Sequence, residues 1–377
     1  MKKRSILTAF LLTFALALFL AGCGSSDDKA SSDDSSDKGV NEDVSLEGVP
    51  ERFADGEKTK IMVIRKIGGD DHTAQFFAGA KQEGEALGFQ VDTFTANGDS
   101  AKFNDAIAQA IQQNYDGLII SHGDDAAVVD QVKEAREKGI DVVAFDSNTD
   151  LLDVEGVTLT AQDDHALATL ALDKLVEEQD GEAKIAYLWV DGFPPMERRN
   201  EIYTQTLEEN PGIEEIERFG VASENTSVDT QDAVAAMLNK HPKGSIDAIF
   251  ATWDAFATGA VRAIEEAGRD EIAIYGIDVS NADLQLMSEE GSSWKYTAAV
   301  DPKLIGAIDL RILAKKLAGE ETPQTFDLEA SLISQEDLLA ADEEVNMENL
   351  ANVIEGWGTS SEFEEDWMIT LKEYHAK

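Results

Sequence analysis

The chain of 377 residues has a single cysteine, and only 31 lysines and arginines against 75 aspartates and glutamates. One cysteine excludes an intrachain disulfide and any zinc site built on cysteines. The formal net charge of −44 argues against a nucleic-acid partner, because phosphate binding requires a cationic surface. Hydrophobic residues still make up 43% of the chain, so it has enough apolar content for a sizeable core.

The chain also lacks the short motifs of common nucleotide-binding and hydrolytic sites. It has no Gly-x-Gly-x-x-Gly loop, no Gly-Lys-Ser/Thr loop, no Gly-x-Ser-x-Gly elbow and no His-x-x-x-His pair. The five histidines are widely spread: His72, His122, His165, His241 and His375. We therefore expect no cofactor and no metal centre. Carboxylates are too abundant to indicate or exclude a catalytic pair.

The first 23 residues have the order of a secretory signal. Three basic residues at 2–4 precede an apolar run at 6–20, and small residues follow. The run is short for a membrane-spanning helix, which needs roughly 20 residues; an uncleaved anchor is the alternative interpretation. Leu20-Ala-Gly-Cys23 resembles the lipobox of bacterial lipoproteins, in which the signal is cut before the cysteine. The resemblance implies a signal peptide at 1–22 and a lipid on Cys23, which would anchor the protein at the extracytoplasmic face of the cell membrane.

Residues 23–57 are predicted to form a disordered acidic linker. Repeated Ser-Ser-Asp-Asp sequence cannot bury enough apolar area to offset the entropy lost on ordering. A calcium site made by the aspartate pairs is the alternative, but no EF-hand spacing supports it.

From residue 59 onward the sequence alternates strands and helices. The predicted strands are continuous apolar runs, at 60–65, 91–94, 117–121, 141–145, 157–160, 185–190, 216–220, 248–251 and 272–277. Helical spacing separates them, at 76–87, 103–111, 126–137, 166–178, 197–208, 230–238 and 257–267. Such runs are typical of parallel sheets covered by helices on both faces. Two successive sets of units predict an α/β fold with two doubly wound parallel-sheet lobes; a single eight-stranded barrel is the alternative.

Acidic and aromatic residues follow most of the predicted strands. In open α/β sheets, ligands bind beyond the carboxyl ends of the strands. The loops there contain Asp146, Asp254 and Asp278, together with the aromatic residues Trp253 and Phe193. Carboxylates accept hydrogen bonds from adjacent hydroxyls and aromatic faces cover a sugar ring, so the set suits a neutral polyhydroxylated ligand. The alternatives are that each aspartate caps a helix and that Trp253 packs between helices.

Six motifs in these units carry a resemblance to a known family. They are Phe-Ala-Gly-Ala-Lys-Gln-Glu-Gly-Glu-Ala-Leu-Gly at 77–88, Asp-Gly-Leu-Ile-Ile at 116–120, Val-Val-Ala-Phe-Asp at 142–146, Ala-Ile-Phe-Ala-Thr-Trp-Asp at 248–254, Ile-Tyr-Gly-Ile-Asp at 274–278 and Asp-Pro-Lys-Leu-Ile-Gly at 301–306. From 58 to 334 the chain resembles type I periplasmic sugar-binding proteins of the ribose/galactose-binding group. The resemblance implies two lobes joined by a three-crossover hinge, with ligand between them. The N-terminal lobe would comprise 58–162 and 301–328, and the C-terminal lobe 163–300 and 329–377, with an acidic tail packed on the second lobe.

The same resemblance implies the ligand-binding residues. They are Asp70, Asp71 and His72 in the first loop, Asp146 and Ser147 after a first-lobe strand, Arg199 or Arg198, and Trp253, Asp254 and Asp278 in the second lobe. Phe193, from a loop after a predicted strand, and Asn225 are two further candidate ligand-binding residues. Two positions depart from the family. The aromatic residues of the usual first loop are replaced by Asp-Asp-His-Thr, and the late glutamine falls at Val300 or Asp301. A smaller or acyclic polyol, or a differently oriented pentose, then becomes a candidate ligand.

The sequence thus predicts a binding protein rather than an enzyme. We expect a monomeric lipoprotein that captures a sugar or polyol and delivers it to the permease subunits of an ABC importer. One alternative is a receptor for a sugar-like signal such as a furanosyl autoinducer; a less favoured one is a secreted carbohydrate-active enzyme. The DNA-binding repressors of this fold are excluded by the export signal and by the absence of a basic N-terminal helix-turn-helix.

Overall fold

The computed structural model describes residues 40–56, 58–69, 71–223 and 225–376. The predicted signal peptide, Cys23 and Asp70 lie outside these ranges. Within the described residues, no helix has both the length and the apolar character needed to cross a membrane.

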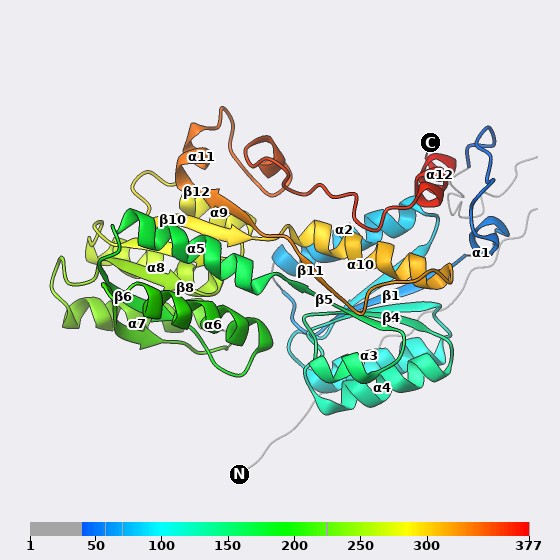
Figure 1. Ribbon diagram of the computed structural model, residues 1–377, viewed down its shortest axis with the longest axis horizontal. Coiled ribbons are helices and arrows are strands. Elements are labelled where there is room, and N and C mark those ends of the chain that lie inside the picture. The colour runs from blue at the N-terminus through cyan, green and yellow to red at the C-terminus, as the bar shows by residue number, and fades with distance from the viewer. Residues whose placement is uncertain (1–39, 57, 70, 224, 377) are drawn as a thin grey trace, which may run out of the picture. The chain divides into compact units, whose positions relative to one another are not determined.

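The first lobe is a parallel sheet of six strands in the order β11-β5-β4-β3-β1-β2 (Figure 1). Its strands are β1 (Lys60–Arg65), β2 (Gln90–Thr95), β3 (Gly117–Ser121), β4 (Asp141–Phe145), β5 (Val157–Gln162) and β11 (Thr325–Leu328). The helices α2 (Asp71–Ala86) and α10 (Pro302–Leu317) cover one face, and α3 (Ser100–Gln112) and α4 (Ala126–Glu137) cover the other. Both faces are therefore buried, which explains why all five residues of β3 are buried.

The second lobe repeats this architecture with strand order β12-β10-β9-β8-β6-β7. Its strands are β6 (Ala183–Leu188), β7 (Ile213–Phe219), β8 (Ala248–Ala251), β9 (Ala273–Ile277), β10 (Trp294–Ala299) and β12 (Ser331–Ser334). Only the edge strand β12 is antiparallel among these described pairs. The helices are α5 (Asp164–Glu178), α6 (Pro194–Glu209), α7 (Thr226–Lys240), α8 (Asp254–Ala267) and α9 (Asn281–Met287). Two separate sheets confirm the predicted fold class and rule out the barrel.

The chain passes between the two sheets three times. It leaves the first sheet after β5, returns to it after β10, and leaves it again between β11 and β12. The third passage is short, because Leu328 ends one strand and Ser331 begins the other.

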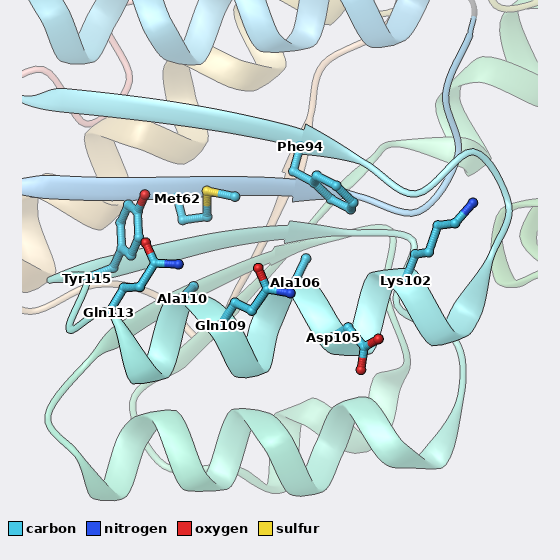
Figure 2. A pocket seen from close by; sticks show the side chains of 9 residues that line it. All are labelled: Met62, Phe94, Lys102, Asp105, Ala106, Gln109, Ala110, Gln113 and Tyr115. Atoms are coloured by element: carbon cyan, nitrogen blue, oxygen red, sulfur yellow. The ribbon is translucent and has the colours of Figure 1, made fainter.

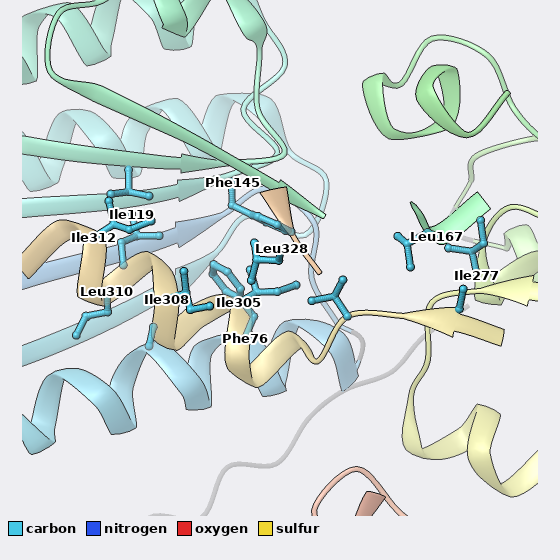
Figure 3. Close-up of a cluster of buried hydrophobic side chains, with 14 of the residues drawn as sticks. Phe76, Ile119, Phe145, Leu167, Ile277, Ile305, Ile308, Leu310, Ile312 and Leu328 are labelled. Atoms are coloured by element: carbon cyan, nitrogen blue, oxygen red, sulfur yellow. The ribbon is translucent and has the colours of Figure 1, made fainter. Parts of the chain in front are cut away.

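A large apolar cluster fixes α2 and α10 on the first sheet (Figure 3). Phe76 of α2 stacks on Phe145 of β4 with their ring centroids 5.7 Å apart. Ile305 and Ile308 of α10 pack in the same cluster, next to Leu328 of β11. These buried side chains hold the carboxyl ends of β1, β3 and β4 in place, and the candidate ligand residues follow those ends.

The C-terminal segment differs from the expectation that it packs on the second lobe. Its first part does so, since α11 (Gln335–Ala340) contacts β10 and β12 and Trp357 lies in the second-lobe core. Its last helix, α12 (Asp366–His375), instead packs on the first lobe through Trp367 and Met368. That part of the prediction is wrong, because the first lobe offers an apolar surface the sequence pattern did not reveal.

The predicted disordered linker also ends earlier than residue 57. Residues 51–54 form the short helix α1 (Glu51–Ala54), and Phe53 within it is 9% exposed. Its ring stacks on Trp367 at 5.2 Å and lies 5.1 Å from Phe89. The prediction was wrong here because the apolar partner of Phe53 comes from the opposite end of the chain.

Candidate ligand-binding site

Polar residues gather where strands of the two sheets end. Three of them directly follow a strand in the left-handed backbone region: His122 after β3 with φ 62°, Asp146 after β4 with φ 43°, and Asp278 after β9 with φ 73°. This conformation is uncommon for residues other than glycine and costs free energy that the surrounding structure must supply. Such residues concentrate at binding sites, and these three mark the same end of both sheets.

Arg199 is a buried residue of the cluster that donates hydrogen bonds to three different groups. Its side chain is 2% exposed. Its Nε donates to Asp164 Oδ1 at 2.7 Å, and its Nη1 donates to Asp278 Oδ2 at 3.1 Å and to the Thr252 carbonyl at 2.5 Å. Burial alone would lower the pKa of Arg199, but the charges of Asp278 and Asp164 outweigh it and the pKa is raised. Arg199 is therefore a fixed, permanently charged group.

Arg198 connects the two lobes. Its Nε donates to Asp164 Oδ2 at 2.9 Å, and its Nη2 donates to Asp146 Oδ1 of the first lobe at 3.3 Å. The sequence left open whether Arg198 or Arg199 belongs to the site, and the structure places both guanidinium groups on the same carboxylate. That carboxylate, Asp164, is 1% exposed and was missed by the sequence analysis.

Asp146 is the first-lobe carboxylate in this group. Burial, and after it the negative charge of Asp164, raise the pKa of Asp146 to about 8, although Arg198 and Arg199 partly offset this. A second contact between the lobes lies nearby, where Gln162 Nε2 at the end of β5 donates to Asp278 Oδ1 at 3.4 Å. Asp146 and Asp278 thus each accept a hydrogen bond from the opposite lobe, and their arginine partners, Arg198 and Arg199, are both bonded to Asp164.

Asp71 and His72, predicted to lie in the first loop, are the first two residues of α2. Asp71 Oδ2 accepts from the backbone N and the Nδ2 of Asn281 in the second lobe, at 3.0 and 2.7 Å. His72 Nδ1 lies 3.0 Å from Arg65 Nη2. Burial, Arg65 and Arg199 lower the pKa of His72 well below its usual value, so the imidazole is neutral at pH 7.

Arg65 is a second residue that the sequence analysis missed. It ends β1, is 3% exposed, and lies over the Phe76 ring at 5.1 Å from the ring centroid. Burial, and then the charge of Arg65, also lower the pKa of His122 well below its usual value. The signal that could have indicated Arg65 is its position in the sequence: it is a charged residue at the carboxyl end of an apolar strand, where ligands bind in such sheets.

The helix-capping alternative is right for some aspartates but not for the central ones. Asp125 accepts from Val128 N at 3.0 Å, and Asp301 accepts from Lys303 N at 2.9 Å, as N-cap residues do. Asp254 is not a cap but the first residue of α8, and its Oδ1 accepts from the adjacent Ala255 N at 2.6 Å. Asp146 and Asp278 instead accept from arginine side chains.

The remaining candidates lie outside this network of charges. Ser147 Oγ donates to the Phe145 carbonyl at 3.0 Å and accepts from Gly123 N at 3.2 Å, so it joins the loop after β4 to the loop after β3. Trp253 is half-buried and meets Phe256 edge-on at 5.7 Å. Phe193 and Asn225 are exposed at the starts of α6 and α7.

Two further features bear on what the cluster can hold. No group of three or more histidine, cysteine, aspartate or glutamate side chains among the described residues is arranged to bind a metal ion.

Figure 2 shows a hollow between the strands β1 and β2 and helix α3, with Met62, Phe94 and Tyr115 on its wall. None of the candidate ligand residues lines that hollow, so it is separate from the charged cluster.

Comparison with known proteins identifies the family to which this fold belongs. Residues 61–321 match a family model described as a periplasmic binding protein domain. The chain belongs to this family. Among its relatives, the ribose import binding protein of Bacillus subtilis is 28% identical over 263 residues, which cover 68% of this chain and 81% of that protein.

Two solved structures are similar to this periplasmic binding protein over a longer part of its chain. A sugar ABC transporter protein from Yersinia enterocolitica is 48% identical, with a TM-score of 0.80 over 87% of this chain and 98% of that one. A 5-methylthioribose transporter solute-binding protein from Thermotoga lettingae, solved with 5-methylthioribose, is 30% identical, with a TM-score of 0.78 over 86% and 99%. Part of the chain beyond the region shared with the Bacillus subtilis relative therefore has counterparts in these structures. Because the relatives are solute-binding transport proteins, the enzyme alternative is set aside.

Proposed function

We propose that this periplasmic binding protein captures a neutral ribose-type sugar, or a closely related polyol, between its lobes and delivers it to the permease of an ABC importer. The observation that carries the proposal is the charge balance of the cluster. Arg198 and Arg199 supply two positive charges, Asp164 and Asp278 supply two negative ones, and Asp146, with a pKa of about 8, is mostly protonated at pH 7. A neutral ligand would leave the charges of these five groups balanced.

The chemistry of these groups suits adjacent hydroxyls. Asp278 accepts hydrogen bonds, the arginines donate them, and a protonated Asp146 does both. Ligand hydroxyls would take over the bonds that now cross between the lobes, from Arg198 to Asp146 and from Gln162 to Asp278. Closure of the lobes around the ligand, a common motion of binding proteins, would then present one compact form to the permease.

The ligand class follows from the relatives together with the first loop. A ribose importer protein and a 5-methylthioribose-binding protein are among the similar chains. In this chain, the aromatic residues usual in the family's first loop are replaced, and His72 and Arg65 lie at that place. We therefore favour ribose and its 5-substituted derivatives over hexoses. Lipid attachment at Cys23, anchoring at the extracytoplasmic membrane face and a monomeric state remain part of the proposal.

Calorimetric titration of the purified protein with ribose, 5-methylthioribose, ribitol and galactose tests this function. We expect saturable binding of a ribose-type ligand, and an increase in unfolding free energy of about 2.7 kcal/mol at a hundredfold excess over Kd. Asp146→Ala should abolish the binding, whereas Arg262→Ala, which changes an exposed arginine of α8, should leave it intact. If none of the four compounds binds, or if Asp146→Ala binds normally, the proposal is wrong.

A further inference from the structure

The C-terminal extension, residues 341–376, is anchored in the core of the second lobe at its beginning. Leu350 is fully buried and Trp357 is 3% exposed in the same cluster as the helices α7 and α8. The backbone N of Met347 donates to Asn281 Oδ1 at 2.9 Å, which ties the extension to the first residue of α9. This part of the extension therefore moves with the second lobe.

The end of the same extension is anchored in the first lobe. Arg311 Nη1 of α10 donates to the Ser360 carbonyl at 2.8 Å. Lys372 Nζ lies 2.7 Å from Glu83 Oε1 of α2, and the same carboxylate accepts from Arg311 Nε at 2.7 Å. Together with the stacking of Trp367 on Phe53, these contacts make residues 360–375 part of the first lobe.

Between the two anchors the extension passes one of the three crossovers. Gly358 has φ 68°, and a Cβ added there would lie 2.7 Å from Asp301 Oδ2. Asp301 caps α10, at the point where the chain returns from the second sheet to the first. The extension is thus a fourth chain segment that passes from one lobe to the other beside the hinge.

Asn281 links this segment to the opposite lobe. Its Oδ1 is held by Met347 N, and its Nδ2 and backbone N both donate to Asp71 Oδ2 of the first lobe. The extension therefore fixes the rotamer in which the amide of Asn281 faces Asp71. A side chain oriented in advance loses less rotamer entropy when it forms an interlobe bond.

We propose that the C-terminal extension is a fourth interlobe connection that restricts opening of the lobes, and that Asn281 is its positioning residue, holding Asp71 across the gap. A tether anchored in both lobes keeps Asn281 and Asp71 at a high effective concentration, so their bond reforms readily after each opening. This inference does not depend on which ligand the protein binds.

Distances between two spin labels, measured by pulsed electron resonance without ligand, test the proposal. The labels would be placed on exposed residues of the two lobes by Gln109→Cys and Glu208→Cys, in full-length protein carrying Cys23→Ser. Asn281→Asp keeps the acceptor for Met347 N but sets a carboxylate against Asp71. We expect the ratio of long to short interlobe distances to rise roughly fivefold, as for the loss of one partly exposed bond to a charged acceptor.

The exchange Asp71→Asn with Asn281→Asp restores the bond in the reverse direction and should return the distances to those of the parent protein. Gly358→Ala, which forces a methyl group onto Asp301, should also lengthen them. Gly356→Ala is the matched control, since Gly356 has φ 83° but nothing within 4 Å of an added Cβ. Unchanged distances in Asn281→Asp, no rescue by the exchange, or equal effects of the two glycine changes would overturn the proposal.

Discussion

The second lobe holds its site charges in a bonded network, whereas the first lobe places its titratable groups at separate strand ends. Arg199 of the second lobe is bonded to Asp164, Asp278 and a backbone carbonyl at once. Asp146 of the first lobe follows β4 and reaches across to Arg198 at 3.3 Å. His72, in the first turn of α2 in the same lobe, lies beside Arg65 at the end of β1.

This difference decides which groups are charged at pH 7. Burial moves these first-lobe groups toward their neutral forms: it raises the pKa of Asp146 to about 8 and lowers the pKa of His72 and His122. In the second lobe, bonded carboxylates raise the pKa of Arg199 and keep it charged. The second lobe therefore offers a preorganised network of charges, and the first lobe offers Arg65 together with neutral hydrogen-bonding groups, a combination suited to polyhydroxylated ligands.

The largest effect should come from breaking the second-lobe network at its centre. Arg199→Ala would leave Asp164 and Asp278 buried without their common cation, and we expect the unfolding free energy to fall by about 3 to 5 kcal/mol, with loss of sugar binding. Chemical denaturation measures the first and calorimetry the second. Arg262→Ala, on the exposed side of α8, should change the unfolding free energy by less than about 0.5 kcal/mol. Equal stabilities of the two variants would contradict the network's importance.

Asp164→Asn should have the next largest effect. The substitution keeps the size of the side chain but removes the charge that both arginines share, while Arg199 retains Asp278 and Arg198 is partly exposed. We expect a loss of about 3 kcal/mol in unfolding free energy, below that of Arg199→Ala. Denaturation curves of the two variants, measured side by side, give the ranking. Asp163→Asn, at the neighbouring helix cap, is the control, because asparagine also caps helices well.

These residues also show what could be predicted from sequence. Continuous apolar runs gave β1 to β9 to within a few residues but missed β10, β11 and β12, and the rule that ligands bind beyond strand ends led to Asp146 and Asp278. Asp164 was missed because it follows the cap Asp163 and looks like an ordinary first-turn acid of α5. Its importance comes from α6, a separate element that brings two arginines onto it. The packing of Trp367 on Phe53 was missed for the same reason, since their separation along the chain hides the contact.

In the first lobe, the expected effect is smaller and depends on pH. An unfolded aspartate has a pKa near 3.9, so between about pH 4 and the folded pKa of Asp146, about 8, only the folded protein holds the proton. Stability therefore falls as the pH rises through this window. Asp146→Asn stays neutral, and we expect the unfolding free energy of the parent protein to fall relative to it by up to about 1.4 kcal/mol for each pH unit within this window. Denaturation at pH 5, 6.5 and 8 measures this, and a constant difference would contradict the raised pKa.

The smallest effect should come from Ser147→Ala. This substitution tests whether the Ser147 hydroxyl supports the backbone of the site or contacts the ligand. Ser147→Ala removes a hydroxyl that donates to the Phe145 carbonyl and accepts from Gly123 N, so we expect a loss of about 1 kcal/mol in unfolding free energy. Because both bonds are to backbone groups of the loops after β3 and β4, the ligand Kd should change by less than about twofold. Denaturation and calorimetry on the same preparation measure the two quantities. A large rise in Kd without a loss of stability would mean that the hydroxyl contacts ligand directly, and that the first lobe binds with more than Asp146 at this strand end.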